Sequence, residues 1–522
     1  MRKTICAAFA AFVTSAFARL EPVNVFSDHM VLQHGKPIPV WGVSEQGAKI
    51  RVEFAGQVKE TVADESWQWK VTLDPLEISC EGREMKLSND RGDEVVYKDI
   101  LVGDVWLCSG QSNMEMNFKW GVTDGDETMA KAAEYPLVRH VKMANETSIA
   151  EEDFVTSTHW GLRWRRACDD MKNVTACGYY FARKLNEKTG IPIGILEAAW
   201  SGCKIEPFIS YYGYTTVPEL KPQLEKLSEL SPQCEKGRRA MEWLCTQLEQ
   251  WTANARTQFA RGNYNLLANP QLWNYSTVDG ATGQYNRMIA PITAIPIKGA
   301  IWYQGCSNRG RWQEYYEMLE TLRAGWGRAF ECGADMPFFL CQITPFGYGY
   351  ADNEEKDNGA TQIREEMERF GRSNGNNVGC AILSDVGELD NIHPGDKRTV
   401  GTRLAALALN RIYGRKNIKC DAPVFVAAKL SADGKKVTLT FDNVEAWNRN
   451  GTYVPRFELA GGDGKYVAVK AEYTTRSKTI DLVVPDGLVP EKVAYMRRSC
   501  VHGFIKNEAG LPLGPFRGTV SR

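Results

Sequence analysis

The sequence predicts an α/β protein in which a central domain built on a parallel sheet is flanked by two β-rich regions. Three observations support this fold class. Nearly continuous apolar runs recur between residues 99 and 385, which is typical of strands buried on both faces of a sheet. Amphipathic helical stretches lie between them, which favours a doubly wound arrangement. Short runs of alternating apolar and polar residues fill the regions before and after.

Five apolar runs are the candidate strands of the central sheet. Their sequences are DILVGDVWLCSG (99–110), PIGILEAAWSG (192–202), IKGAIWYQG (297–305), MPFFLCQITPF (336–346) and NNVGCAILSD (376–385). After the last run, Val400, Leu404 and Leu407 recur at helical spacing, and Gly414 is well placed as a helix stop. Strands and helices therefore alternate through the central domain.

The two flanking regions have the alternating pattern of half-buried strands. KIRVEFAG and WQWKVTLDP show it near the N-terminus, and KKVTLTFDNV and KTIDLVVPDG show it near the C-terminus. We expect an N-terminal β domain over residues 19–98, the α/β domain over 99–420 and a C-terminal β-rich domain over 421–522.

Residues 217–262 differ from the rest of the central domain and predict a helical insertion. Met241, Leu244, Leu248 and Trp251 form one apolar stripe along a charged helix. Because such stripes usually bury against their own chain, we expect this helix to pack on the α/β body rather than to bind a partner.

Residues 1–18 have the pattern of a secretory signal peptide. Arg2 and Lys3 precede the apolar run TICAAFAAFVTSAFA, which ends in the small-residue pattern Ala16-Phe17-Ala18. The run is shorter than the about 20 residues that span a bilayer, and no other segment predicts a membrane span. We expect cleavage after Ala18 and a secreted or periplasmic protein.

Charge and cysteine content exclude several classes of function. Lys and Arg number 63 against 64 Asp and Glu, so no basic excess points to nucleic acid. Of fourteen cysteines, Cys6 lies in the leader, and no C-x-x-C pair suggests a zinc or redox motif. Disulfide connectivity and oligomeric state cannot be read from the sequence, and we expect neither a metal nor an organic cofactor.

Small polar and acid–base residues follow four of the predicted strands. In open α/β sheets, ligands bind beyond the carboxyl ends of the strands, so these residues are candidates for a site. The segments are Ser109-Gly110-Gln111-Ser112-Asn113, Ser201-Gly202, Gly305-Cys306-Ser307-Asn308 and Asp390-Asn391-Ile392-His393.

A serine hydroxyl becomes a useful nucleophile only when a neighbouring base removes its proton. Of the six histidines, His393 alone has a carboxylate, Asp390, three residues earlier and lies just past a strand end. Asp390 can orient the imidazole while its other nitrogen faces Ser112. We predict a catalytic triad of Ser112, Asp390 and His393, although an ordinary turn or an exposed loop histidine would explain each motif alone.

Acyl transfer also requires preorganised donors for the oxyanion of the tetrahedral intermediate. The candidates are the backbone N–H groups of Ser112 and Gly202 and a side-chain amide from Gln304 or Asn308. A tight turn and a structural hydrogen bond are the alternative explanations for Gly202 and Gln304.

Three tryptophans and one amide are candidates for contact with a substrate. Trp120, Trp200 and Trp302 could each stack on a sugar ring, although a buried core position is the commoner role of tryptophan. Trp120 is the best candidate because it lies just beyond the nucleophile turn, and Asn113 beside Ser112 is a candidate polar contact.

At these residues the chain resembles the sialate O-acetylesterases of the SGNH-hydrolase superfamily, over nearly the whole mature chain. The matching segments are FSDHMVLQHGKPIPVWG, GDVWLCSGQSNMEM, YNRMIAPI, IKGAIWYQGCSN, DNIHPGDKRTVGTRLA and NEAGLPLGPFR. The resemblance implies a flavodoxin-like catalytic domain combined with β domains, a nucleophile at Ser112 and a D-x-x-H pair at Asp390 and His393. The implied reaction is deacetylation of O-acetylated sugars, sialic acid being the substrate that names the family.

The sequence departs from the family pattern at two places. Cys306 replaces the glutamate of the usual Q-G-E-S-N element, and W-G-G-T reads Trp200-Ser201-Gly202-Cys203 here. Neither change affects the predicted triad, so they bear on which sugar is the substrate. Three alternatives remain: an acetylesterase for plant or other polysaccharide, a non-catalytic carbohydrate-binding protein and, last, a serine peptidase.

Overall fold

The structure is a computed structural model. It describes residues 20–153, 162–230, 235–265, 268–270, 282–347, 359–448, 456–498 and 504–522. The predicted leader, residues 1–18, lies outside the described residues. Within the described part of the chain, no helix combines the length and the apolar character needed to cross a membrane.

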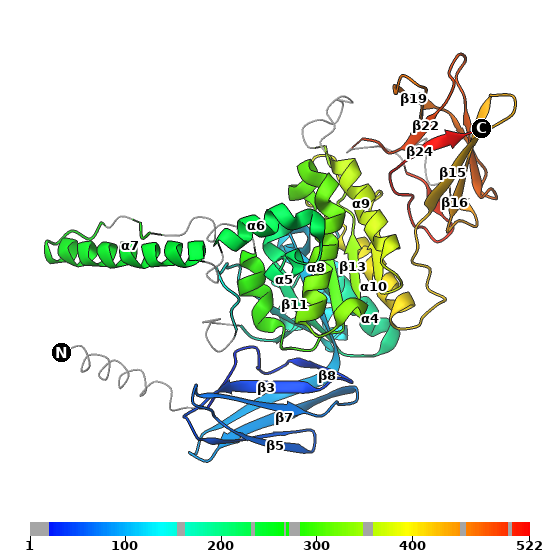
Figure 1. The fold of residues 1–522 in the computed structure, drawn as a ribbon. Coiled ribbons are helices and arrows are strands. Elements are labelled where there is room, and N and C mark those ends of the chain that lie inside the picture. The colour runs from blue at the N-terminus through cyan, green and yellow to red at the C-terminus, as the bar shows by residue number, and fades with distance from the viewer. Residues whose placement is uncertain are drawn as a thin grey trace.

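The five predicted apolar runs form neighbouring parallel strands of one sheet (Figure 1). Their order across the sheet is β11-β8-β12-β13-β14. The strands are β8 (Glu94–Gly110), β11 (Ile193–Ala199), β12 (Gly299–Tyr303), β13 (Phe338–Cys341) and β14 (Val378–Ala381). Two strands that the sequence did not predict extend the sheet beyond β11: β9 (Val138–Lys142), which is parallel, and β10 (Arg165–Arg166), which is antiparallel.

Helices cover both faces of this sheet, as the apolar strands predicted. Successive side chains of a strand point to opposite faces, so Trp106 and Leu107 of β8 belong to two different cores. The core with Trp106 includes helices α4 (Ala176–Thr189) and α10 (Lys397–Arg411). The core with Leu107 includes α5 (Tyr211–Tyr214), α8 (Tyr315–Ala329) and α9 (Ala360–Ser373).

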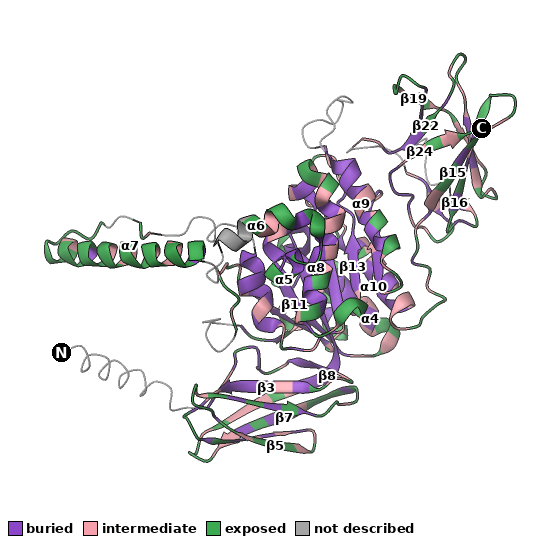
Figure 2. Cartoon of the chain, viewed as in Figure 1, coloured by how far each residue is buried: buried purple, intermediate pink, exposed green. Residues whose placement is uncertain are grey.

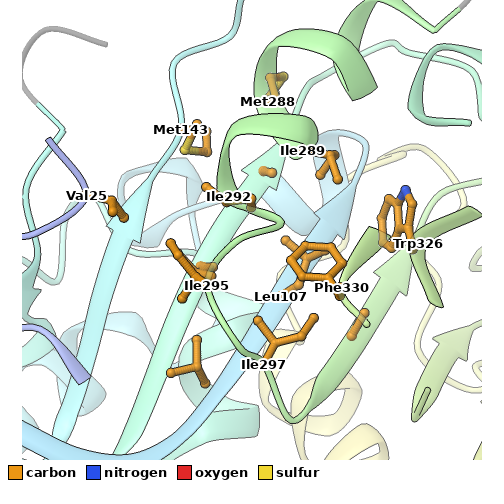
Figure 3. Close-up of a cluster of buried hydrophobic side chains, with 14 of the residues drawn as sticks. Val25, Leu107, Met143, Met288, Ile289, Ile292, Ile295, Ile297, Trp326 and Phe330 are labelled. Atoms are coloured by element: carbon orange, nitrogen blue, oxygen red, sulfur yellow. The ribbon is translucent and has the colours of Figure 1, made fainter. Parts of the chain in front are cut away.

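The N-terminal β region shares a strand and a core with the central sheet. The predicted boundary at residues 98 and 99 lies inside β8, which pairs with β7 through its first half and with β11 and β12 through its second. Val25 of the N-terminal region and Leu107 of β8 belong to one buried cluster, part of which is drawn in Figure 3. The strands before β8 are β1 (Glu21–Pro22), β2 (Val31–Gln33), β3 (Ile38–Val43), β4 (Lys49–Phe54), β5 (Gln57–Val62), β6 (Gln68–Leu73) and β7 (Ser79–Asn89).

The C-terminal β region has a hydrophobic core of its own. Its strands form a sheet in the order β19-β18-β22-β24-β15-β16-β21-β20. These are β15 (Val424–Leu430), β16 (Lys436–Asp442), β18 (Phe457–Ala460), β19 (Tyr466–Val469), β20 (Ala471–Glu472), β21 (Thr479–Val483), β22 (Lys492–Tyr495) and β24 (Phe516–Ser521). A separate ribbon pairs β17 (Trp447–Asn448) with β23 (Lys506–Asn507).

The helical insertion is present, but its long helix does not pack on the α/β body. Helix α7 (Glu235–Ala260) extends away from the domain, and its main neighbour is α6 (Lys221–Leu230) (Figure 1). Most of α7 is exposed, with only Gly237 and Ala255 buried (Figure 2). The expectation of packing on the body was wrong, because an apolar stripe does not determine which surface covers it.

Candidate active site

The candidate site lies where β8, β11 and β12 end side by side. β8 runs into Gln111 and the short helix α2 (Ser112–Glu115). The Gln111 N–H donates to the Tyr303 carbonyl at 3.0 Å, and the Gln111 side-chain oxygen accepts the Gly305 N–H at 2.9 Å. On the other side the Trp200 N–H donates to the Gly110 carbonyl at 3.1 Å. Parallel pairing therefore brings three of the predicted polar segments together.

Ser112 and Gly202 both present free donors here. Ser112 is 7% exposed, and neither its hydroxyl nor its N–H forms a hydrogen bond with another described residue. The N–H of Gly202 likewise has no acceptor among the described residues. Gly202 has φ of +76° and open space where a side chain would begin, so the turn needs glycine and faces no covering atoms.

Glu115, which the sequence analysis did not single out, holds this turn. Its carboxylate accepts the N–H of Ser201 at 2.7 Å and the Ser201 hydroxyl at 2.6 Å. Lys142 at 3.0 Å and Asn145 at 2.7 Å donate to the other carboxylate oxygen. Burial opposes ionisation of Glu115, but Lys142 and the hydrogen bonds outweigh it and lower the pKa. The helix that begins with Ser112 thus also fixes the residue before Gly202.

Lys142 is shared with a second buried carboxylate, Glu197 of β11. The Lys142 ammonium lies 3.0 Å from Glu197 as well as from Glu115. Burial raises the pKa of Glu197 to about 7 despite this neighbour. One lysine thus compensates two acidic groups beneath the site.

The two candidate amides differ in their spare donors. The Gln304 amide nitrogen donates to the Cys203 carbonyl at 3.2 Å and to the Asn308 side-chain oxygen at 2.8 Å. The Asn308 amide nitrogen donates to Glu206 at 2.8 Å, its one hydrogen bond to a described residue. Since an amide carries two N–H donors, Gln304 has none left and Asn308 has one.

The loop that contains His393 runs from β14 to α10 and reaches the nucleophile turn. The Asn113 amide nitrogen donates to the Ile392 carbonyl at 2.9 Å. The residues next to Ser112 and next to His393 are therefore directly hydrogen-bonded. The Thr123 N–H also donates to the Gly395 carbonyl at 3.1 Å, which ties the loop to the segment after α2.

The ring of His393 is half-buried beside Trp120. The two ring centroids are 5.7 Å apart in an edge-to-face arrangement, and Trp120 is 43% exposed. Burial and, second, the positive charge of Lys397 lower the pKa of His393. The imidazole is therefore neutral at neutral pH, which is the form that can accept a proton.

Asp390 is exposed, and within the described residues no hydrogen bond joins it to His393. The loop is instead stabilised by Glu388 and Asn391. Glu388 accepts the Gly395 N–H at 2.8 Å and the Asn391 amide at 2.9 Å. Asn391 accepts the His393 N–H at 3.0 Å. The triad role of Asp390 stays a prediction.

Among the other candidates, Trp302 belongs to the core and Trp200 is half-buried. Trp302 is fully buried, with its ring centroid 5.6 Å from that of Phe208. The Asn113 amide nitrogen donates to the histidine loop and its side-chain oxygen accepts from Lys397 of α10, which leaves its predicted substrate contact a prediction. Cys306 is 7% exposed, and the neighbouring Ser307 hydroxyl donates to the Gly202 carbonyl at 3.0 Å.

The structure is similar to a solved carbohydrate acetylesterase. A crystal structure of that protein from Xanthomonas citri matches with a TM-score of 0.75 and 28% sequence identity. The match covers 95% of this chain and 99% of the other. No family model matches the chain.

The relatives found by sequence carry a more specific name than the solved structure does. The chain is 26% identical to the sialate O-acetylesterase of Rattus norvegicus over 452 residues, which cover 80% of this chain and 78% of the relative. It is 25% identical to that of Homo sapiens over 437 residues, which cover 77% and 72%. The predicted resemblance to sialate O-acetylesterases is confirmed, and these relatives support an esterase.

Proposed function

We propose that this protein is a secreted serine esterase that removes O-acetyl groups from sialic acid or related acetylated sugars. One observation carries the proposal: the hydrogen bond from Asn113 to the Ile392 carbonyl, 2.9 Å long, which joins the neighbours of Ser112 and His393. Consecutive Cα atoms are about 3.8 Å apart, so this bond keeps the hydroxyl and the imidazole in one small region. The names of the relatives supply the class of substrate.

In the proposed mechanism the Ser112 hydroxyl oxygen attacks the acetyl carbonyl while His393 accepts its proton. The tetrahedral intermediate collapses, and His393 returns the proton to the departing sugar hydroxyl, which leaves an acetyl ester on Ser112. Water then attacks this ester with His393 again as base, and acetate and the free serine are released. Asp390 would orient the imidazolium, since catalytic hydrogen bonds that are absent from a free enzyme often form in the substrate complex.

The oxyanion of each intermediate would be held by three donors. The N–H groups of Ser112 and Gly202 have no other acceptor among the described residues, which supports this role. For the third donor we favour Asn308 over Gln304, because only Asn308 has an amide N–H to spare. Ser201 and Glu115 would keep the Gly202 N–H in place.

Trp120 would form a platform for the sugar beside the reacting groups. A tryptophan that is 43% exposed next to His393 offers an apolar face for the ring of a pyranose. When the additional parallel strand β9 is set aside, the order β11-β8-β12-β13-β14 corresponds to the order 2-1-3-4-5 of the flavodoxin-like fold, which supports that assignment. The chemistry as written needs no metal or organic cofactor.

The test compares acetate release from O-acetylated sialic acids and acetylated xylan by the wild type and by Ser112→Ala. We expect release from the sialic acids by the wild type only. Faster release from xylan would favour a polysaccharide acetylesterase. Equal rates for the two proteins on every ester would leave a carbohydrate-binding protein.

A further inference from the structure

Lys397 is a fully buried lysine located between the two halves of the candidate site. It is the first residue of α10 and has no exposed surface. Its ammonium donates to the Asn113 side-chain oxygen at 2.7 Å and to the Pro394 carbonyl at 2.6 Å. Asn113 follows Ser112, and Pro394 follows His393. The same ammonium therefore bridges the nucleophile turn and the histidine loop.

Several titratable groups face this ammonium from the surrounding elements. Cys177 of α4 and Cys341 of β13 lie on the helix and sheet sides, and Glu388 and Asp396 belong to its own loop. The ring of Tyr303 in β12 lies 5.9 Å from the ammonium nitrogen. Burial nevertheless lowers the pKa of Lys397 to about 8, so the lysine is mostly charged at neutral pH. A buried charge is costly unless it is well compensated, and a neutral side chain would hold the core at lower cost.

We propose that Lys397 is a positioning residue of the esterase, whose ammonium fixes the Ser112 turn against the His393 loop and whose positive charge, hydrogen-bonded to the residue after His393, disfavours the protonated imidazole. This inference rests on the proposed function. Its two parts are separable, because the hydrogen bonds act through Asn113 and Pro394 while the charge acts on His393 directly.

The positive charge of Lys397 acts on the protonation of His393 in a defined direction. A positive neighbour disfavours the protonated imidazole, and Lys397 is the charged group that, after burial, lowers the pKa of His393. Replacing Lys397 by a neutral residue of similar length therefore raises the pKa of His393. In a profile of kcat/KM against pH, the acid limb moves to higher pH, because the base must be neutral to accept the serine proton.

The experiment compares the wild type with Lys397→Met and Asn113→Ala. Asn113→Ala removes an acceptor of the ammonium together with the amide that donates to the Ile392 carbonyl, and it leaves the charge of Lys397 in place. We expect both variants to lower kcat/KM at neutral pH by about 10-fold to 100-fold, as a misplaced catalytic pair would. Only Lys397→Met should shift the acid limb upwards.

An NMR titration of His393 in ¹³C-histidine-labelled protein measures the same change in its pKa without relying on enzyme activity. Its resonance is assigned by its loss in His393→Asn. We expect a higher titration midpoint in Lys397→Met and an unchanged one in Asn113→Ala. If Lys397→Met does not retain the thermal midpoint of the wild type, Lys397→Gln, which is also neutral, replaces it. We expect the same higher titration midpoint of His393 in that variant.

An unchanged midpoint in the neutral variants, or a kcat/KM within about twofold of the wild type, would overturn the role of Lys397. Failure of the proposed function looks different. In that case Ser112→Ala and His393→Asn would be as active as the wild type, whatever Lys397 does.

Discussion

The two halves of the candidate site are built in different ways. The nucleophile half consists of the ends of β8, β11 and β12, which parallel pairing places side by side. The histidine half is a loop that leaves β14, a strand separated from β12 by β13. It is held against the nucleophile half by the Asn113 and Lys397 side chains and by loop hydrogen bonds.

This difference shows where the geometry of the site is vulnerable. Backbone pairing along β8 fixes the nucleophile half over many residues, whereas individual side chains and single backbone hydrogen bonds, such as that from Thr123 to Gly395, fix the position of the loop. The loop has further support from the C-terminal region. Asp385 at its start forms ion pairs with Arg403 at 2.6 Å and with Lys506 of β23 at 2.7 Å. Substitutions of the side chains that hold the loop should therefore change the position of His393 without removing a reacting group.

The largest expected effect is that of removing the nucleophile. Ser112→Ala should lower kcat for a chromogenic acetyl ester by at least about 10⁴-fold, because it removes the hydroxyl that His393 is proposed to activate. Ser109→Ala is the matched control. Its buried hydroxyl donates to the Ala198 carbonyl at 2.5 Å, so its loss should affect stability much more than rate. Equal losses in the two variants would contradict the assignment.

The second largest effect is expected from removing the negative charge of Asp390 in the histidine loop. Asp390→Asn should lower kcat by about 10²-fold or more if this carboxylate orients the imidazolium. Glu388→Gln should cost less, because Glu388 stabilises the loop through Gly395 and Asn391 without contacting His393. Full activity of Asp390→Asn would reduce the proposed triad to a serine–histidine dyad.

A smaller effect is expected from the carboxylate that holds the Gly202 turn. Glu115→Gln weakens two hydrogen bonds to Ser201 and should lower kcat by about tenfold while leaving KM nearly unchanged. Glu127→Gln, which changes an exposed residue paired with Lys131, is the control. A rise in KM alone would mean that Glu115 acts on substrate binding instead.

The smallest effect should come from the contact with the C-terminal region. Lys506→Ala removes one of two cations from Asp385, and Arg403 keeps that carboxylate paired. Burial opposes ionisation of Asp385, but Arg403 and then Lys506 outweigh it and lower the pKa. We expect a stability loss of about 1 kcal/mol by thermal unfolding and a rate within about twofold of the wild type. A large loss of activity would mean that the C-terminal region directly sets the loop.

The nucleophile half could be predicted from the sequence, because apolar runs identify strands and their carboxyl ends identify the site. The strands that lead to the segments with Ser112, Gly202 and Asn308 pair side by side, as that reasoning requires. Lys397 was missed because a lysine in a charged helix start usually indicates a solvated surface, and its burial depends on which elements pack around it. Glu115 was missed because its role depends on tertiary structure: its partner Ser201 is distant in sequence.

The direction in which α7 extends could not be predicted from the sequence either. Its apolar stripe predicted a helix correctly, but the periodicity of a stripe carries no information about the surface that covers it. The position of β9 beside β11 depends on long-range pairing in the same way.

The most direct test of the account is covalent labelling with a fluorophosphonate, followed by peptide mass spectrometry. We expect a phosphonyl adduct on Ser112 of the wild type and, because His393 must activate that hydroxyl, almost none in His393→Asn. An adduct on another residue, or equal labelling of Ser112 with and without the imidazole, would contradict the proposed mechanism.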